Sequence, residues 1–222
     1  MAQGDLKGTL KATAASITNP FDATGSVSVA VGDLVFGTIS EQTSLTATAA
    51  TDNLGNTYAA VNAGTDAGNV AIRSFYARVT VAGTLTAVHF AATGSTNDVS
   101  CVADAFEGPF EVSPLDANPT NTTDATTPFT CPATGTLAQA SELIVSAIAL
   151  GGNQSGLAAD SPFTTGGVAN RNNTTTAHGY RKVAATTTVT PSFSGVSATA
   201  AQTTASFKLS ALATRSFGMV IG

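Results

Sequence analysis

Apolar and polar residues alternate at a period of two over most of the chain, which is the spacing of a β-strand with one buried face. Thr and Ser fill many of the polar positions, and Val, Ile, Phe and Ala fill the apolar ones. Helix signals are nearly absent, so the pattern predicts an all-β chain. The clearest alternations predict strands at 26–31, 33–39, 73–81, 85–90, 99–106, 143–150, 183–189 and 201–209.

Turn-forming residues separate these predicted strands. Gly32-Asp33, Ala82-Gly83 and Gly151-Gly152-Asn153 supply the backbone freedom and the side-chain hydrogen bonds that turns use. Residues 52–56, Asp-Asn-Leu-Gly-Asn, predict a tight hairpin between strands at 45–51 and 57–62. The same oxygens suit calcium, but the run lacks the bidentate Glu of a calcium loop. Short strands divided this often predict an antiparallel β-sandwich or barrel.

Two stretches interrupt the alternation. Residues 113–132 carry four prolines, and proline is excluded from central strands, so this stretch predicts a long crossover connection. Residues 152–176 are rich in Gly, Asn and Thr and predict a long surface loop. Each flanking part alone would leave open sheet edges, so we expect a single β-sandwich over 26–212 rather than two domains. An N-terminal arm, 1–25, and a C-terminal tail, 213–222, then lie outside it.

The composition narrows the classes of protein. Only 10% of the 222 residues are charged, against roughly 25% in a typical soluble domain, and 43% are hydrophobic. Such a chain has enough apolar surface to fold, which excludes a disordered acidic segment. The net charge of -5 argues against nucleic acid as a partner, because phosphate binding needs a basic surface.

Membrane and export signals are not expected. The longest apolar run, 143–150, is far shorter than the roughly 20 residues that cross a bilayer, so no membrane span is expected. Asp5, Lys7 and Lys11 interrupt the start of the chain, where a signal peptide needs an apolar stretch. We therefore expect the protein to be made in the cytoplasm and kept there, without a signal peptide.

The charges are unevenly distributed along the chain. No Lys or Arg occurs between Arg78 and Arg171, whereas eight Asp and Glu residues do, and no Asp or Glu follows Asp160. One interpretation is that adjacent strands of one sandwich neutralise each other. The other is that acidic and basic faces meet between neighbouring subunits, where complementary charge fixes the register.

Candidate chemistry is sparse. The chain has no nucleophile elbow, phosphate loop, dinucleotide-binding or zinc-protease motif, so it predicts no catalytic residue, no cofactor and no metal site. His89 is interpreted as a strand residue that faces solvent or a satisfied partner, and His178 as a residue where a loop returns to a strand. Cys101 and Cys131 are either two small buried hydrophobes or a disulfide, within or between subunits, that forms outside a reducing cytosol.

Five segments, read in order, resemble a known family. They are Val-Gly-Asp-Leu-Val at 31–35, Thr-Asp-Asn-Leu-Gly-Asn-Thr-Tyr at 51–58, Ser-Phe-Tyr-Ala at 74–77, Ser-Pro-Leu-Asp-Ala at 113–117 and Ser-Glu-Leu-Ile-Val at 141–145. The set is similar to a β-sandwich module that recurs in phage virion proteins and bacterial surface proteins, with patterns such as GDLLV, DSAGNTY and GELLV. Residues 178–181 and 199–209 match its closing strands, and Phe75 stands where the family usually has Trp.

The resemblance covers residues 26–212 and implies one jelly-roll-like antiparallel β-sandwich without catalytic residues. It implies a phage virion structural protein, and we expect a capsid decoration or cement protein that forms a homo-oligomer, a trimer before other symmetries. The expected partners are the major capsid protein or other virion proteins. The alternatives are a tail or head fibre module that binds host-surface polysaccharide, and a polysaccharide hydrolase. Inter-subunit contacts are expected at both ends of the chain, from Lys7, Lys11, Arg215, Phe217, Met219, Val220 and Ile221.

Overall fold

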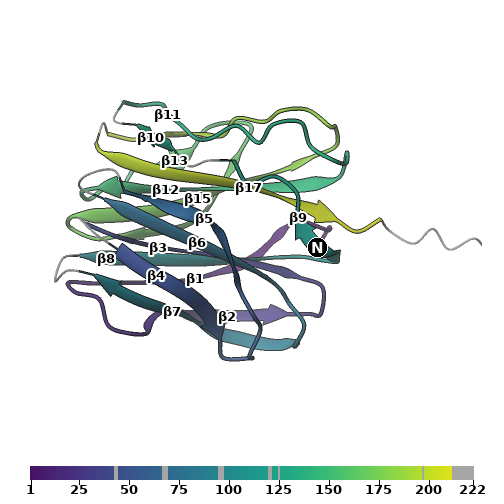
Figure 1. The fold of residues 1–222 in the computed structure, drawn as a ribbon, viewed down its shortest axis with the longest axis horizontal. Coiled ribbons are helices and arrows are strands. Elements are labelled where there is room, and N and C mark those ends of the chain that lie inside the picture. Colours follow the sequence, from purple (N-terminus) through teal and green to yellow (C-terminus); the bar gives the residue numbers. More distant parts are fainter. Residues whose placement is uncertain are drawn as a thin grey trace, which may run out of the picture.

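The computed structural model describes residues 1–42, 45–66, 70–94, 98–119, 122–124, 126–196 and 198–211, with the side chains of 62–66, 94, 122 and 124 left aside (Figure 1). Strands and their connections make up this part of the chain, and it contains no helix that could cross a membrane. The strands are β1 Leu6–Ala14, β2 Phe21–Val29, β3 Leu34–Glu41, β4 Leu45–Asp52, β5 Ala59–Asp66, β6 Ala71–Arg78, β7 Gly83–Gly94, β8 Val99–Phe106, β9 Phe110–Leu115, β10 Thr122–Asp124, β11 Phe129–Thr130, β12 Glu142–Gly151, β13 Ala158–Ala159, β14 Thr164–Asn170, β15 Thr174–Val183, β16 Ser192–Ser194 and β17 Ala200–Leu209.

The first eight strands form one antiparallel sheet in the order β4-β7-β2-β1-β8-β3-β6-β5. This sheet folds over on itself, so that β4, β7 and β2 lie across from β8, β3 and β6 (Figure 1). Side chains from both halves fill the space between them and form the first core, which includes Leu10, Ile39, Phe75, Phe90 and Cys101. The two edge strands, β4 and β5, are consecutive in the chain and meet at a single bridge between Thr51 and Thr57, which nearly closes the sheet.

A second sheet, β10-β17-β12-β15-β14 with β9 also on β17, covers the outer face of β8, β3, β6 and β5. A second core lies between them and includes Phe36, Phe106, Val145 and Phe207. The short third sheet, β11-β16-β13, packs on the far side of the second sheet. The molecule is thus a stack of four layers, seen as successive bands in Figure 1. The predicted all-β antiparallel sandwich is confirmed.

Residues 1–25 are not an arm outside the sandwich. β1 lies in the middle of the first sheet, paired with β2 on one side and with β8 along its length on the other. The prediction was wrong because β1 carries few large apolar residues. Leu10 is fully buried, but Gly8 stands where a larger side chain would collide with Val27, so the usual alternation is weak.

The two predicted connections also contain strands. The crossover at 113–132 includes β10, β11 and the end of β9. β9 and β10 lie end to end along the outer edge of β17, where proline is tolerated. The loop predicted at 152–176 includes β14, whose Gly166 and Gly167 allow it to lie close against β8. A β-carbon on Gly166 would meet the carboxylate of Asp104, so these glycines mark a close approach rather than a turn. The strand predicted at 183–189 ends at Val183 instead.

Of the hairpin predicted around residues 52–56, the structure has the antiparallel bridge between Thr51 and Thr57, beyond which the two flanking strands separate. β4 pairs with β7 and β5 pairs with β6, in opposite layers of the folded sheet. Asp52 accepts hydrogen bonds from the backbone N–H groups of Leu54 and Asn56 and from the side chains of Asn56 and Tyr58. The loop therefore joins the two edges of the first sheet.

Candidate functional site

A band of buried polar side chains lies between the second and third layers, beside the second core. It arises because alternate residues of three strands face the same interface. β3 contributes Thr38 and Ser40, and β8 contributes Ser100 and Asp104. β15 contributes Thr174, Thr176 and His178. We call this set the interlayer polar band.

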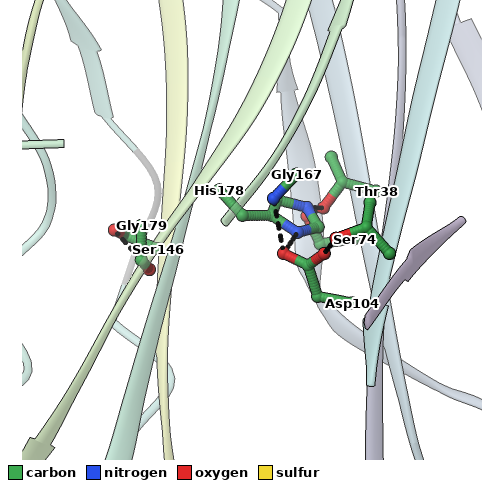
Figure 2. Close-up of polar contacts among 8 residues, drawn as sticks. Thr38, Ser74, Asp104, Ser146, Gly167, His178 and Gly179 are labelled. Atoms are coloured by element: carbon green, nitrogen blue, oxygen red, sulfur yellow. Dashed lines mark hydrogen bonds and ion pairs between the residues drawn. The ribbon is translucent and has the colours of Figure 1, made fainter. Parts of the chain in front are cut away.

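His178 is at the centre of one half of the band (Figure 2). Its Nδ1 lies 3.0 Å from Oδ2 of Asp104, and its Nε2 lies 2.9 Å from the hydroxyl of Thr38. Because an ionised carboxylate can only accept, Nδ1 donates to Asp104, while Nε2 and the Thr38 hydroxyl form the second hydrogen bond of the ring. Asp104 also accepts from the N–H of Gly167 at 3.0 Å and from the hydroxyl of Thr9. One carboxylate thus ties β8 to β1, β14 and β15.

The order carboxylate, imidazole and hydroxyl is the one that hydrolases use to activate a nucleophile. Here Asp104, His178 and Thr38 all have zero exposure. The Thr38 hydroxyl also contacts Ser74 at 2.9 Å, on the neighbouring strand β6. A substrate would have to separate the two layers to reach this hydroxyl. In this geometry the group holds the layers together, as a fully satisfied buried network does.

The other half of the band consists of hydroxyl groups. Ser40 lies 3.0 Å from Ser100 and 3.1 Å from Thr174, and Ser100 lies 2.6 Å from Thr176. All four side chains are fully buried. Small hydroxyl groups that donate and accept at once can satisfy one another in a dry interface, so this part of the band needs no charge.

Lys7 forms an ion pair inside its own chain. Its amino group lies 2.7 Å from Asp33 and 3.3 Å from Glu107, and Asp33 is only 2% exposed. Asp33 also accepts from the N–H groups of Ala30 and Gly108, both at 2.8 Å. Burial lowers the pKa of Lys7, but the two carboxylates outweigh it and raise the pKa above its ordinary value. Its position in a central strand aims Lys7 at this internal ion pair, and the expected inter-subunit contact of Lys7 stays a prediction.

Two further ion pairs join described charges that lie far apart in the sequence. Arg171 pairs with Asp98 at 3.0 Å, and Lys182 pairs with Asp5. Lys11 reaches across to β14 and donates to the carbonyl of Val168 at 3.2 Å. The pair of Arg171 with Asp98 joins the acidic middle to the basic end of the chain within one subunit, as the first interpretation predicts. Arg215, Phe217, Met219, Val220 and Ile221 lie outside the described residues.

The two cysteines do not form a disulfide with each other. Cys101 points from β8 into the first core, and Cys131 packs in the outer core against the third sheet. Both side chains are buried, so neither reaches a neighbouring subunit. Burial raises the pKa of the Cys101 thiol to about 12, which keeps it protonated and unreactive. Cys101 and Cys131 are the small buried hydrophobes of the other interpretation.

The remaining candidates have protein partners. His89 lies 2.8 Å from Asp22 on the neighbouring strand, as its interpretation as a satisfied strand residue predicts. The carboxylate of Asp52 is occupied by the donors of its own loop. Among the residues that the structure describes, no three His, Cys, Asp or Glu side chains are grouped so as to hold a metal ion.

Glu142 is a buried carboxyl group that sequence reasoning missed. It begins β12 with zero exposure; one oxygen accepts from the N–H of Gln139 at 3.2 Å, and the other has no hydrogen-bond partner among the described residues. Burial raises the pKa of Glu142, and the nearby charge of Asp116 raises it further, against the hydrogen bonds that lower it. The folded protein therefore holds the Glu142 proton more tightly than the unfolded chain does.

Replacing Glu142 with Gln should stabilise the protein at neutral pH. In the wild type, this carboxyl reduces stability as the pH rises from the unfolded pKa through the raised folded pKa. Glu142→Gln removes that loss and places an amide donor toward Asp116, for a gain of about 1 kcal/mol at pH 7. Urea unfolding at pH 4 and pH 7 measures the effect. Glu111→Gln is the control, because it removes the same charge on the partly exposed β9. It should leave the difference in the free energy of unfolding between pH 4 and pH 7 as in the wild type. An equal change in both variants would contradict the role of burial.

The exposed apolar side chains gather mainly at one end of the stack. Val31 is 60% exposed, Val81 is 46% exposed and Val112 is 84% exposed. The first two lie in the turns that join β2 to β3 and β6 to β7, and Val112 lies on the nearby β9 (Figure 1). A groove of about 410 Å³ opens there between β9 and the strands β5 and β6. Such a surface is suited to contact with another protein.

Sequence reasoning underrated His178 and passed over Asp104 as one of several acidic residues. The available signal was the period of two: Thr174, Thr176 and His178 share one face of a strand, as do Ser100 and Asp104. Polar residues on alternate positions usually indicate a solvent-facing side, so the pattern alone did not reveal that a second sheet covers them.

Comparisons with known proteins add no relative. No family model matches the chain, and neither a curated protein nor a solved structure matches it.

Proposed function

We propose that the protein is a non-enzymatic virion structural protein that decorates a phage capsid and stabilises the shell through subunit contacts. The proposal rests on one contrast: the polar groups that could carry out chemistry are inaccessible, whereas apolar side chains are exposed at one end of the stack. The carboxylate, imidazole and hydroxyl set is fully buried, whereas exposed valines and an open groove meet at the end of the stack where the chain leaves β17.

The layered build supports a mechanical role. β3, β8 and nearly all of β12 and β17 are buried on both faces, and ion pairs such as that of Lys7 with Asp33 tie the strands together. A rigid protein of this kind need not rearrange when it binds, so the free energy of its contacts goes into stabilising the shell. A decoration protein whose contacts exist only on the mature shell stabilises that shell by mass action, by about 2.7 kcal/mol per site at a concentration of 100 times Kd.

Binding to shells tests the proposal. The purified chain is mixed with phage capsid shells stripped of accessory proteins, and bound protein is measured by co-sedimentation while light scattering gives the mass of the free chain. We expect saturable binding by a homo-oligomer and a higher melting temperature of the decorated shell. A monomer that ignores the shells and binds host cells or their polysaccharide would overturn the proposal in favour of a fibre module.

A further inference from the structure

The groove at the apolar end has one unpaired strand edge. β9 pairs with β17, through Leu115 opposite Phe207 and Phe110 opposite Leu209. No other described strand pairs with it, and its middle residues Val112 and Ser113 are exposed. An exposed strand edge is a template for an added strand, through main-chain hydrogen bonds that are still available.

The groove beside this edge can take apolar side chains. Its lining includes Tyr76, Val112, Pro114 and Leu115, and its volume of about 410 Å³ is in the range that admits a few side chains of a bound peptide. The Tyr76 ring packs on Phe207 with centroids 5.1 Å apart, which fixes the floor of the groove. This side of β9 thus combines an unpaired strand edge with a groove that can hold side chains.

The C-terminal tail starts beside the first residue of β9. The N–H of Ser210 donates to the carbonyl of Pro109 at 3.0 Å, and the described chain ends at Ala211. The following 11 residues include Arg215 and the apolar Phe217, Met219, Val220 and Ile221. Extended, they reach up to about 36 Å, and Phe217, Met219 and Ile221 have the spacing of one face of a strand.

The tail cannot readily fill the groove of its own subunit. It leaves from the β17 side of β9, and the end of β9 is closed by neighbours: Gln3 donates to the carbonyls of Pro109 and Ser210, and Arg78 donates to that of Phe110. To reach the outer edge of β9, the tail would have to turn back on β17 and cross this closed end. The residues used in that turn would shorten the strand that the tail could add.

We propose that the groove between β9 and β5–β6 binds residues 212–222 of a second copy, which add a strand to the outer edge of β9. Apolar side chains of the tail enter the groove beside Tyr76 and Val112, and Glu111 on the same edge complements Arg215. The inference rests on the proposed function for the choice of another subunit as the partner. It adds to that function the surface that receives the tail, which is the groove between β9 and β5–β6.

The test uses the full chain and three variants. Val112→Glu charges the groove, Val220→Glu charges the tail, and Val196→Glu is the matched control, since Val196 is 71% exposed and lies near the opposite end of the stack, close to Gln154. Because all these positions are exposed or outside the described fold, each variant should give the circular dichroism spectrum of the wild type, which shows that it folds. Light scattering should show an oligomer for the wild type and Val196→Glu, and at least a tenfold weaker association for the other two. A synthetic peptide of residues 212–222 should dissociate the wild-type oligomer.

The outcomes separate this inference from the proposed function. An oligomer that survives both Val112→Glu and Val220→Glu overturns the tail-in-groove contact, whether or not the chain binds shells. The wild type could instead be monomeric and bind labelled peptide only after Val220→Glu is introduced. That result would show that the tail occupies the groove of its own subunit, and it would also overturn the contact between two copies. Loss of shell binding with intact tail-dependent association leaves the contact standing and removes the capsid role.

Discussion

Asp104→Ala is expected to lower the free energy of unfolding by about 3–5 kcal/mol. The substitution removes the acceptor of three donors at once: the imidazole of His178, the N–H of Gly167 and the hydroxyl of Thr9. Water does not reach most of this site, because Asp104 and His178 have zero exposure and Gly167 is buried, whereas Thr9 is partly buried. Each buried donor is then left without an acceptor, which costs free energy because water cannot replace it. The second and third layers also lose the hydrogen bonds that join them at this point. Urea unfolding followed by circular dichroism measures the loss.

The chain contains a matched control for this substitution. Asp22 and His89 form the same kind of pair, with the carboxylate 2.8 Å from Nδ1, but their side chains are 39% and 32% exposed. Water replaces the missing partner there, so Asp22→Ala should cost less than about 1 kcal/mol. Similar losses in the two variants would mean that burial does not set the value of the Asp104 network.

Gly108→Ala is expected to cost about 3 kcal/mol or more, the second large effect. A β-carbon on Gly108 would lie 2.6 Å from the carbonyl carbon of Gly32 and 2.8 Å from the backbone nitrogen of Asp33. These are backbone atoms, so no side-chain rotation relieves the contact. A shift would also break the hydrogen bonds from Gly108 to Asp33 and from Phe110 to Gly32, both 2.8 Å.

Gly156→Ala is the control for the glycine substitution. A β-carbon at Gly156 meets nothing within 4 Å, and its backbone is outside the left-handed region. The variant should have the stability of the wild type within about 0.5 kcal/mol. If Gly108→Ala were equally neutral, the close packing of the β2–β3 turn against the start of β9 would be disproved. Thermal unfolding of both variants at one protein concentration decides it.

The strands with large apolar residues could be predicted from the sequence. The predictions at 99–106 and 143–150 match β8 and β12 to within a residue at either end, since Val, Ile, Leu and Phe there are dense enough to indicate a buried strand. Fold class followed from the same pattern, because the turns between such strands are too frequent for helices.

What could not be predicted is where small and polar residues are buried. β1 and β14 escaped notice because Gly8, Gly166 and Gly167 serve close packing, and glycine usually indicates a turn. The same holds for the interlayer polar band, whose Thr and Ser residues have the spacing of a solvent-exposed face. Only the position of the second sheet distinguishes the two situations, and that position depends on contacts between residues more than 70 apart in the chain.

The division of the layers also has a consequence for synthesis on the ribosome. All eight strands of the first sheet come from residues 6–106, so this half can fold on its own core before the second sheet is translated. Until then, the face that awaits the second sheet is open to solvent. The hydroxyl groups and the carboxylate of the interlayer polar band make part of that face hydrophilic. The nascent chain is thereby protected against premature aggregation at the surface that later becomes one of its driest interfaces.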